Sequence, residues 1–291
     1  MTTNTKANVL REMLKDRSTI KMGAGVHDAI SAKLAEKAGF DFIWISGLGL
    51  SSVNGVPDGS LLTFGDFLPA FSMISQSVHI PVIADCDNGY GDAANASFTA
   101  VQIINRTNLA GICIEDNPYP KRNSLVSGHD RLLVTQQEMV HKISAIRDSV
   151  GDDLFVIGRC ESLIAGEGID DALLRAKAYV SAGADAILIH TKDKLAQEVA
   201  MISEKWDYSA PLVIVPTAFP QISSKQLHGM GYSMAIYANQ ALRAALTSIQ
   251  YSYKLIKEDK ANDLEMEIMK LSELFDLTST KYLSYNEEVK I

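Results

Sequence analysis

The feature that most constrains the fold is a regular alternation of short apolar runs with longer amphipathic segments. Eight runs of β-forming residues recur along the chain: "TIKMGAGV" from Thr19, "DFIWISG" from Asp41, "PVIADCD" from Pro81, "AGICIED" from Ala110, "LFVIGRCE" from Leu154, "DAILIH" from Asp185, "PLVIVP" from Pro211 and "SMAIYAN" from Ser233. Their apolar residues are continuous rather than alternating, which is typical of strands covered on both faces. The runs therefore predict a buried parallel sheet.

The segments between the runs have the periodicity of helices. In "DAISAKLAEKAG", "TQQEMVHKISAIRDSV" and "DALLRAKAYVSAGA", apolar residues recur at intervals of three and four positions. "EKAGFD" and "VSAGAD" each end such a segment with glycine just before the next run. Eight βα units in about 240 residues predict an α/β fold with a closed (β/α)₈ TIM barrel, and an open doubly wound sheet is the alternative.

The domain organisation follows from length and composition. A chain of 291 residues with 47% hydrophobic residues can bury one large core, and a barrel of this kind takes about 250 residues. No linker rich in Pro, Ser or Gly divides the chain. We therefore predict one domain over residues 1–291, with residues 240–291 as a C-terminal helical segment. This segment is longer than a closing helix requires, so we expect it to pack on a neighbour or across the barrel.

The charge balance and the apolar runs restrict partners and location. With 27 basic and 35 acidic side chains the net charge is -8, which disfavours a nucleic acid or an anionic membrane as partner. No run reaches the roughly 18 apolar residues of a membrane span, and the start "MTTNTKANVLREMLKD" lacks a secretion signal. We expect a cytoplasmic protein. Cys86, Cys113 and Cys160 have no paired spacing, so we expect packing residues.

Polar side chains gather at the carboxyl ends of the predicted strands. In a barrel these ends meet on one face, where active sites lie. The residues there are Trp44, Ser46, Gly47 and Leu48 after the second run, Asp85 and Asp87 after the third, Glu115 and Asp116 after the fourth, Arg159 and Glu161 after the fifth, His190 after the sixth and Asn239 after the eighth. We therefore expect several acids and a few cationic or amide groups at this end of the barrel.

The acids of this set favour a divalent metal ion. Converging carboxylates repel one another unless a proton or a cation lies between them. A set of oxygen ligands without cysteine or several histidines favours a hard ion, so Asp85, Asp87 and Glu115 together predict Mg²⁺. The alternative is that each acid caps a helix or pairs with arginine.

The remaining polar groups suit a small anion. Arg159, His190, Ser46 and the backbone amides of "SGLGLSS" could surround phosphate or carboxylate oxygens. Gly47 could equally serve a tight turn, and His190 taken alone could be a core histidine.

Several motifs together resemble the phosphoenolpyruvate mutase family of the isocitrate lyase superfamily. They are "WISGLGLSS", "DCDNGYGD", "GICIEDNPYPKRNS", "GRCESLIAGEG", "GADAILIHTK", "VIVPT" and "ANQALRAA", in this order from about Ile20 onward. The resemblance implies a barrel whose eighth helix is exchanged between subunits and a Mg²⁺-dependent homotetramer built from dimers. The implied activity is the interconversion of phosphoenolpyruvate and phosphonopyruvate, which makes a carbon–phosphorus bond.

The resemblance also implies roles for single residues. Asp85 matches the direct metal ligand, while Asp58, Asp87 and Glu115 match acids that hold the metal's waters. The substrate pocket is matched by Trp44, Ser46, Gly47 and Leu48, its cationic wall by Arg159 and His190, and a gating loop by Lys121, Asn123 and Ser124. The residues expected to act in catalysis are Asp58, Lys121, Asn123, Arg159 and His190.

The gating loop separates the branches of the superfamily. The carbon–carbon lyases carry a cysteine in "KRCG", where this chain has "KRNS" from Lys121, so lyase activity is not expected. Phosphonopyruvate hydrolase has threonine in place of Asn123, although "VPTAFPQIS" from Val215 resembles the hydrolase. We weight the loop above that stretch and predict a mutase. Asn117 and Arg122 depart from the mutase pattern. The alternative to an enzyme is a binding protein, in which an inactive barrel only binds a metabolite.

Overall fold

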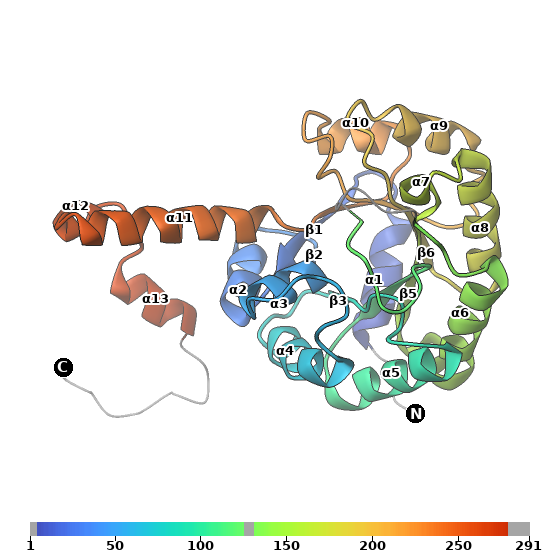
Figure 1. Cartoon of the computed structure of the whole chain (residues 1–291), viewed down its shortest axis with the longest axis horizontal. Coiled ribbons are helices and arrows are strands. Elements are labelled where there is room, and N and C mark those ends of the chain that lie inside the picture. The colour runs from blue at the N-terminus through green and yellow to red at the C-terminus, as the bar shows by residue number, and fades with distance from the viewer. Residues whose placement is uncertain (1–4, 125–130, 279–291) are drawn as a thin grey trace. The chain divides into compact units, whose positions relative to one another are not determined.

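A computed structural model of the chain describes residues 5–124 and 131–278 and has eight parallel strands in a closed barrel (Figure 1). The strands are β1 (Lys21–Val26), β2 (Phe42–Ile45), β3 (Val82–Asp85), β4 (Gly111–Glu115), β5 (Phe155–Cys160), β6 (Ala186–Ile189), β7 (Leu212–Ile214) and β8 (Met234–Tyr237). Each strand pairs with the next, and β8 pairs with β1. The predicted TIM barrel is confirmed, and the open sheet is excluded.

Helices surround the barrel and follow its strands (Figure 1). They are α2 (Ala29–Lys37), α3 (Gly47–Val53), α4 (Phe64–Gln76), α5 (Ala93–Arg106), α6 (Gln136–Val150), α7 (Ser162–Ala165), α8 (Ile169–Ser181), α9 (Gln197–Lys205) and α10 (Ser224–Gly229), with a short 3₁₀ helix η1 (Gly151–Asp153). Side-chain caps fix where they begin: Asp28 accepts a hydrogen bond from the Ser31 amide in α2, and Thr135 accepts one from the Glu138 amide in α6.

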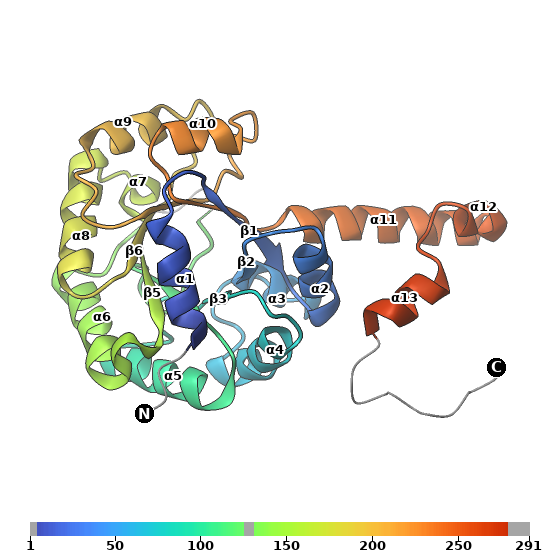
Figure 2. The same cartoon turned by 180° about the vertical axis from the view of Figure 1, so that it is seen from behind.

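The strands separate two apolar layers. In β2, Ile43 and Ile45 pack outward against the helices, while Phe42 and Trp44 point into the barrel. Helix α1 (Thr5–Lys15) lies across the end of the barrel that is opposite the carboxyl ends of the strands (Figure 2), and its Leu10 belongs to the inner cluster. The interior is therefore a packed core closed at one end, which leaves the other end for a site.

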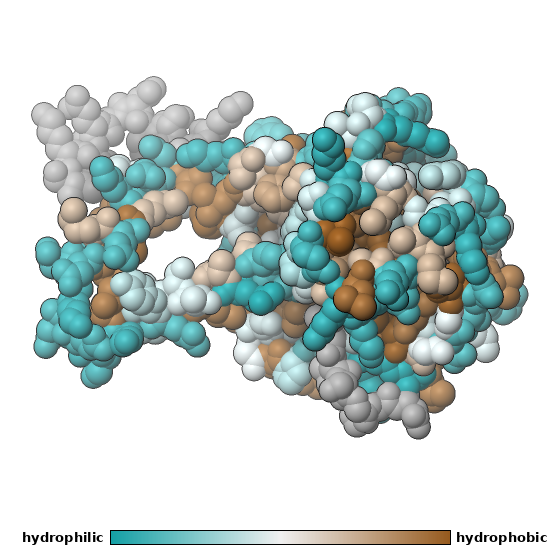
Figure 3. Space-filling model, turned by 90° about the horizontal axis from the view of Figure 1, so that it is seen from above, coloured by the Kyte–Doolittle hydropathy of each residue, from teal (hydrophilic) through white to brown (hydrophobic). Residues whose placement is uncertain are grey.

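The C-terminal residues form a second compact unit. The contacts divide the chain into residues 1–242 and 243–291. Helix α11 (Gln240–Lys257) leads into the second unit, which also contains α12 (Ala261–Glu265) and α13 (Leu271–Thr278). Apolar residues reach the surface of the molecule (Figure 3), and those of the second unit include Leu246, Ile249, Tyr253, Ile256, Met266, Met269, Leu271 and Phe275. The helical character agrees with the sequence; exchange of a helix between subunits stays a prediction.

Within the described residues, no helix has both the length and the apolar character needed to span a bilayer.

A partly buried ionic cluster connects β5 and β6 to the helices α1 and α6. Asp185, just before β6, accepts hydrogen bonds from Arg11 Nε of α1 at 3.0 Å, from Arg147 Nη2 of α6, and from the Val156 amide of β5 at 2.8 Å. Arg11 and Arg147 also donate to the carbonyl oxygen of Leu154, at 3.0 and 2.7 Å. One carboxylate thus fixes four segments on the face away from the strands' carboxyl ends.

We expect Asp185→Asn to lower the free energy of unfolding by about 3 kcal/mol, because two guanidinium groups lose their shared anion in a partly buried place. Urea unfolding of the purified protein measures this difference. Asp170→Asn is the matched control, since Asp170 pairs with Lys205 on the surface and such pairs contribute less than about 1 kcal/mol. Equal losses in the two variants would contradict the role of the cluster.

Candidate active site

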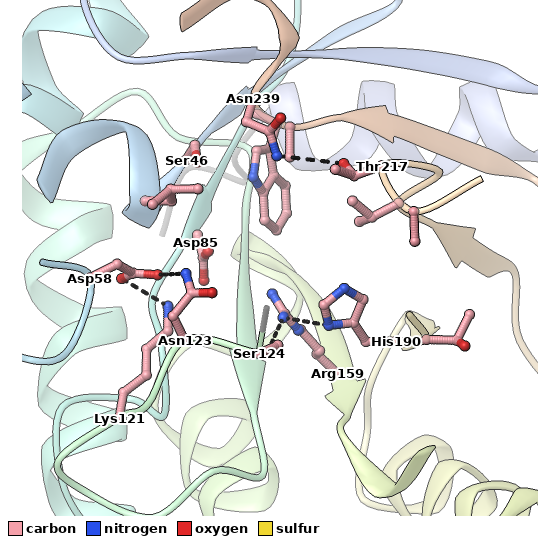
Figure 4. A pocket seen from close by; sticks show the side chains of 16 residues that line it. Ser46, Asp58, Asp85, Lys121, Asn123, Ser124, Arg159, His190, Thr217 and Asn239 are labelled. Carbon is pink, nitrogen blue, oxygen red and sulfur yellow. Dashed lines mark hydrogen bonds and ion pairs between the residues drawn. The ribbon is translucent and has the colours of Figure 1, made fainter. Parts of the chain in front are cut away.

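A pocket opens at the carboxyl ends of the strands (Figure 4). It is lined by Trp44, Ser46, Leu48, Asp58, Asp85, Lys121, Asn123, Ser124, Arg159, His190, Thr191, Val215, Thr217, Ala218, Ala238 and Asn239. Ten of these are residues that the sequence had singled out for a site role. The structure therefore brings together side chains from β2, β3, β5, the end of β6 and the segments after α3 and β4.

Asp85 and Asp87 face one point beside the first turn of α3. A Cβ atom added to Gly47 would lie 3.2 Å from Asp87 Oδ1 and 3.3 Å from Asp85 Oδ2. The backbone of Asp87 has a positive φ of 48°. Glycine at position 47 therefore leaves open a small cradle walled by two carboxylates.

Glu115 adds a third acid behind this cradle. Its Oε1 accepts a hydrogen bond from Asn117 Nδ2 at 2.9 Å, whereas its buried Oε2 has no hydrogen-bond partner and lies 3.2 Å from Arg159 Nε as an ion pair. Burial raises the pKa of Asp87 to about 7; Lys121 opposes this rise, and Asp85 and Glu115 add to it. The group holds more negative charge than its neighbours neutralise.

The acid group fits a hard divalent cation. Its donors are carboxylate oxygens, one of which lacks a hydrogen bond, and the Gly47 cradle lies between two of them. Among the described residues, no three His, Cys, Asp or Glu side chains are arranged as a complete metal site. The arrangement suits an ion with few direct protein ligands that keeps several waters, as Mg²⁺ prefers.

Lys121 supplies a cation to the same group from the segment after β4. Its Nζ lies 2.5 Å from Asp87 Oδ1 and 3.3 Å from Asp58 Oδ1. Burial would lower the pKa of Lys121, but the surrounding carboxylates raise it well above its ordinary value. Asn123 Nδ2 donates to Asp58 Oδ2 at 2.6 Å, and the Lys121 amide donates to Ser60 Oγ. The segment is thus docked onto residues 58–60 above the pocket.

The cationic wall on the other side is organised by Glu161. Its Oε1 accepts a hydrogen bond from Arg159 Nε at 2.6 Å and lies 2.9 Å from His190 Nδ1, while its Oε2 accepts one from Ser124 Oγ at 2.6 Å. Burial would raise the pKa of Glu161, but Arg159 and His190 outweigh it and hold that pKa well below its ordinary value. Glu161 is therefore a buried anion that joins three predicted site residues.

The sequence named Glu161 only as a strand-end residue, without a role. Its position two residues after Arg159 was the available signal. Glu161 contacts its near neighbour Arg159, but it also contacts His190, 29 positions away, and Ser124, 37 positions away. Sequence spacing does not reveal such contacts, because they depend on how strand ends converge.

A second part of the pocket was not assigned from the sequence. Thr191, Val215, Thr217, Ala218 and Ala238 line the wall made by the ends of β6, β7 and β8. Asn239 was recognised there as a strand-end residue; its Nδ2 lies 3.5 Å from Thr217 Oγ1, and its Oδ1 is buried without a hydrogen-bond partner.

Ser46 has a local structural role. Its Oγ accepts a hydrogen bond from the Gly49 amide at 3.1 Å and so caps α3. Trp44 is 2% exposed and lines the pocket.

The three cysteines are fully buried, and burial raises the pKa of each thiol well above its ordinary value. None of them lines the pocket. This is the environment of inert packing thiols rather than of a reactive thiolate.

Three known proteins are similar to this chain over most of its length. The crystal structure of a phosphoenolpyruvate phosphomutase from Streptomyces platensis subsp. rosaceus is 38% identical, covers 93% of this chain and 94% of its own, and superposes with a TM-score of 0.90. A phosphonopyruvate hydrolase from a Variovorax species (strain Pal2) is also 38% identical, over 88% of each chain. A structure of phosphonopyruvate hydrolase in complex with oxalate and Mg²⁺ is 33% identical, covers 94% of both chains and has a TM-score of 0.86.

The family model described as phosphoenolpyruvate phosphomutase matches residues 10–257, which include every strand of the barrel and every predicted site residue. The chain therefore belongs to the phosphoenolpyruvate phosphomutase family of isomerase-type enzymes.

Proposed function

We propose that this enzyme interconverts phosphoenolpyruvate and phosphonopyruvate, in the step of phosphonate biosynthesis that forms the carbon–phosphorus bond. The observation that carries the proposal is the Asn123 amide, which lines the pocket and is held by Asp58 at 2.6 Å. The lyases have a thiol in this loop, whereas all three cysteines of this chain lie outside the pocket lining. An amide can bind a phosphoryl group but cannot serve as a proton donor to a leaving enolate.

The remaining groups suit the two charges of such a substrate. Arg159 and His190 offer cationic and hydrogen-bonding atoms on one wall, and Ser124 stands beside them. Phosphoryl transfer needs little covalent chemistry from the protein, because positioning and charge neutralisation suffice. In the proposed reaction, Arg159 neutralises charge on the phosphoryl group while Asn123 directs it between the enolate oxygen and the carbon. The loop over the pocket keeps water from the transferring group.

We further propose that Asp85 binds Mg²⁺ directly and that Asp58, Asp87 and Glu115 hold it through water. The cradle at Gly47 and Glu115 Oε2, which accepts no hydrogen bond, support this assignment. When bound, the ion would supply electrostatic stabilisation to an enolate oxygen. The protein's own part is to hold the acids at fixed positions, with Lys121 paired to two of them.

The assembly and location belong to the same proposal. We expect a homotetramer formed as a dimer of dimers, with α11 exchanged between subunits, in the cytoplasm. The exposed apolar residues of α11, including Leu246, Ile249 and Tyr253, support a partner subunit on this helix.

A second candidate is the hydrolase reaction, which gives pyruvate and phosphate from phosphonopyruvate. It is favoured by the hydrolase relative that is as identical to this chain as the mutase structure. Phosphorus NMR of phosphonopyruvate with enzyme and Mg²⁺ decides between the two, because phosphoenolpyruvate and inorganic phosphate give separate signals. The mutase proposal expects phosphoenolpyruvate, and phosphate as the main product of the wild type would overturn it.

For Asn123→Ala we expect the mutase rate to fall about a hundredfold, or about 3 kcal/mol, because the amide acts mainly in the transition state. Part of the remaining turnover should give pyruvate and phosphate, since the shield against water is weakened. Steady-state kinetics and the product ratio by phosphorus NMR measure both effects. An unchanged rate and product ratio would show that the loop only covers the site.

For Asp85→Ala we expect loss of turnover that ordinary Mg²⁺ concentrations do not restore, because the direct metal ligand is gone. Calorimetric titration with Mn²⁺ should show an affinity at least about tenfold below that of the wild type. Asp41→Ala is a control at a carboxylate that binds the Met22 amide, and it should leave Mn²⁺ affinity unchanged. Full activity of thoroughly chelated wild type would contradict the metal assignment.

For Glu161→Gln we expect the free energy of unfolding at pH 7 to fall by about 3 kcal/mol, because Arg159 loses a buried partner. The pKa of Glu161 lies below its ordinary value of 4.5 in the folded state, so its stabilisation is present above about pH 4.5 and is lost as the pH falls. Urea unfolding at pH 7 and pH 4 should therefore give a smaller difference at the lower pH. A difference independent of pH would contradict the assignment.

A further inference from the structure

We propose that Asp116, Tyr179 and Arg175 form a positioning network behind the active site, which sets both Glu161 and the base of the loop that carries Lys121 and Asn123. None of the three lines the pocket. They would act on the reaction only through the residues that they hold. The proposal deepens the proposed function, and its test separates the two.

The network begins with a carboxylate that faces away from the substrate. Asp116 follows β4 and is 0% exposed. Its Oδ1 accepts a hydrogen bond from the Glu161 amide at 2.8 Å, and its Oδ2 accepts one from Tyr179 Oη at 2.7 Å. Arg175 Nη1 lies 3.4 Å from the same Oδ2. One buried anion thus joins the end of β4, the end of β5 and two successive turns of α8.

The same residues close the base of the loop. The Val134 amide donates to the Asp116 carbonyl oxygen at 2.9 Å, and Arg175 Nη1 donates to the Val134 carbonyl oxygen at 2.8 Å. Asp116 directly precedes the described residues 117–124, and Val134 directly follows the described residues 131–133. In the first of these stretches, Ser124 donates to the Glu161 carboxylate. The loop is therefore tied to the network at its base through Asp116 and at Ser124 through Glu161.

These connections make the position of Glu161 depend on Asp116. The Glu161 amide is bound by Asp116, while the Glu161 carboxylate contacts Arg159, His190 and Ser124. A shift of this backbone would move all three contacts together. Displacements of about 1 Å in a positioned group can lower a rate about a hundredfold. A buried carboxylate is costly to keep at a place that needs only packing, so the network serves the placement of the site.

The test compares two buried tyrosines. Tyr179→Phe removes the hydroxyl group bound to Asp116. Tyr232→Phe is the matched control, because Tyr232 is 2% exposed and its hydroxyl donates to the Val199 carbonyl oxygen at 3.1 Å, with no contact to the acid group. Each variant loses one buried hydroxyl group, so small falls in melting temperature are expected, with the larger one in Tyr179→Phe because that hydroxyl also interacts with Arg175. Their kinetics should differ.

With phosphonopyruvate and Mg²⁺, we expect Tyr179→Phe to lower kcat about tenfold, which is near the lower end of the contribution of one hydrogen bond to a charged group. KM should change by less than about twofold, because misplacement affects the transition state more than the bound ground state. The share of phosphate among the products should rise, since the loop base is loosened. Tyr232→Phe should keep the wild-type kcat and product ratio.

Equal kinetics and product ratios in Tyr179→Phe and Tyr232→Phe would overturn the network. If Tyr179→Phe does not fold, Arg175→Gln takes its place. This variant keeps the hydrogen bond from Tyr179 to Asp116 but loses the one from Arg175 to the Val134 carbonyl oxygen. It should raise the share of phosphate among the products. A wild-type product ratio in folded Arg175→Gln would likewise overturn the network.

The network and the proposed function fail in different ways. If the wild type yields phosphate alone, the mutase proposal fails. The network is still supported in that case if the hydrolase activity falls about tenfold in Tyr179→Phe and stays at the wild-type level in Tyr232→Phe. If the wild type turns over neither compound, the nitrogen-15 signals of the His190 ring give the test. Tyr179→Phe should move them through Glu161, and Tyr232→Phe should not; unmoved signals in Tyr179→Phe would overturn the network.

Discussion

The crowding of buried carboxylates at one end of the barrel is the constraint on which the site depends. Asp85, Asp87 and Glu115 are all buried there, and burial together with mutual repulsion raises the pKa of Asp87 to about 7. Such a group is stable as anions only when cations stand beside it. Lys121 and Arg159 each pair with a member of the group. The loop and the fifth strand are thus held to the acids by the same electrostatic requirement that favours a divalent ion.

The barrel meets this requirement through the register of its strands. Asp85 pairs with Cys113, and Glu115 pairs with Arg159, across β3, β4 and β5. An acid at the end of one strand therefore lies beside a cation at the end of the next, although they are 44 positions apart in the sequence. Glu161 continues the alternation of charge toward His190. At the opposite end of the barrel, α1 packs against the inner cluster and Asp185 binds α1, α6 and β5.

Much of the fold and part of the site could be predicted from the sequence. The apolar runs and helix periodicity indicated every strand, because burial on both faces leaves a local signal, and the strand ends indicated which polar residues converge. The inner packing of Leu10, the contacts of Glu161 and the bond between Asp116 and Tyr179 were not predicted. They depend on side-chain direction between segments far apart in the chain, for which no local pattern exists. The pocket residues at the end of β7 were not predicted, because a valine such as Val215 or a threonine such as Thr217 carries no signal of a site in the sequence.

Identity to known proteins does not separate the two reactions, since a mutase structure and a hydrolase are each 38% identical to this chain. The physical difference between the reactions is whether water or carbon reaches the phosphoryl group first. The hydrogen bond that Asn123 Nδ2 donates to Asp58 fixes the orientation of this amide at the pocket. In the proposed mutase reaction, this held amide is the group that binds the phosphoryl group and takes up space that an attacking water would need.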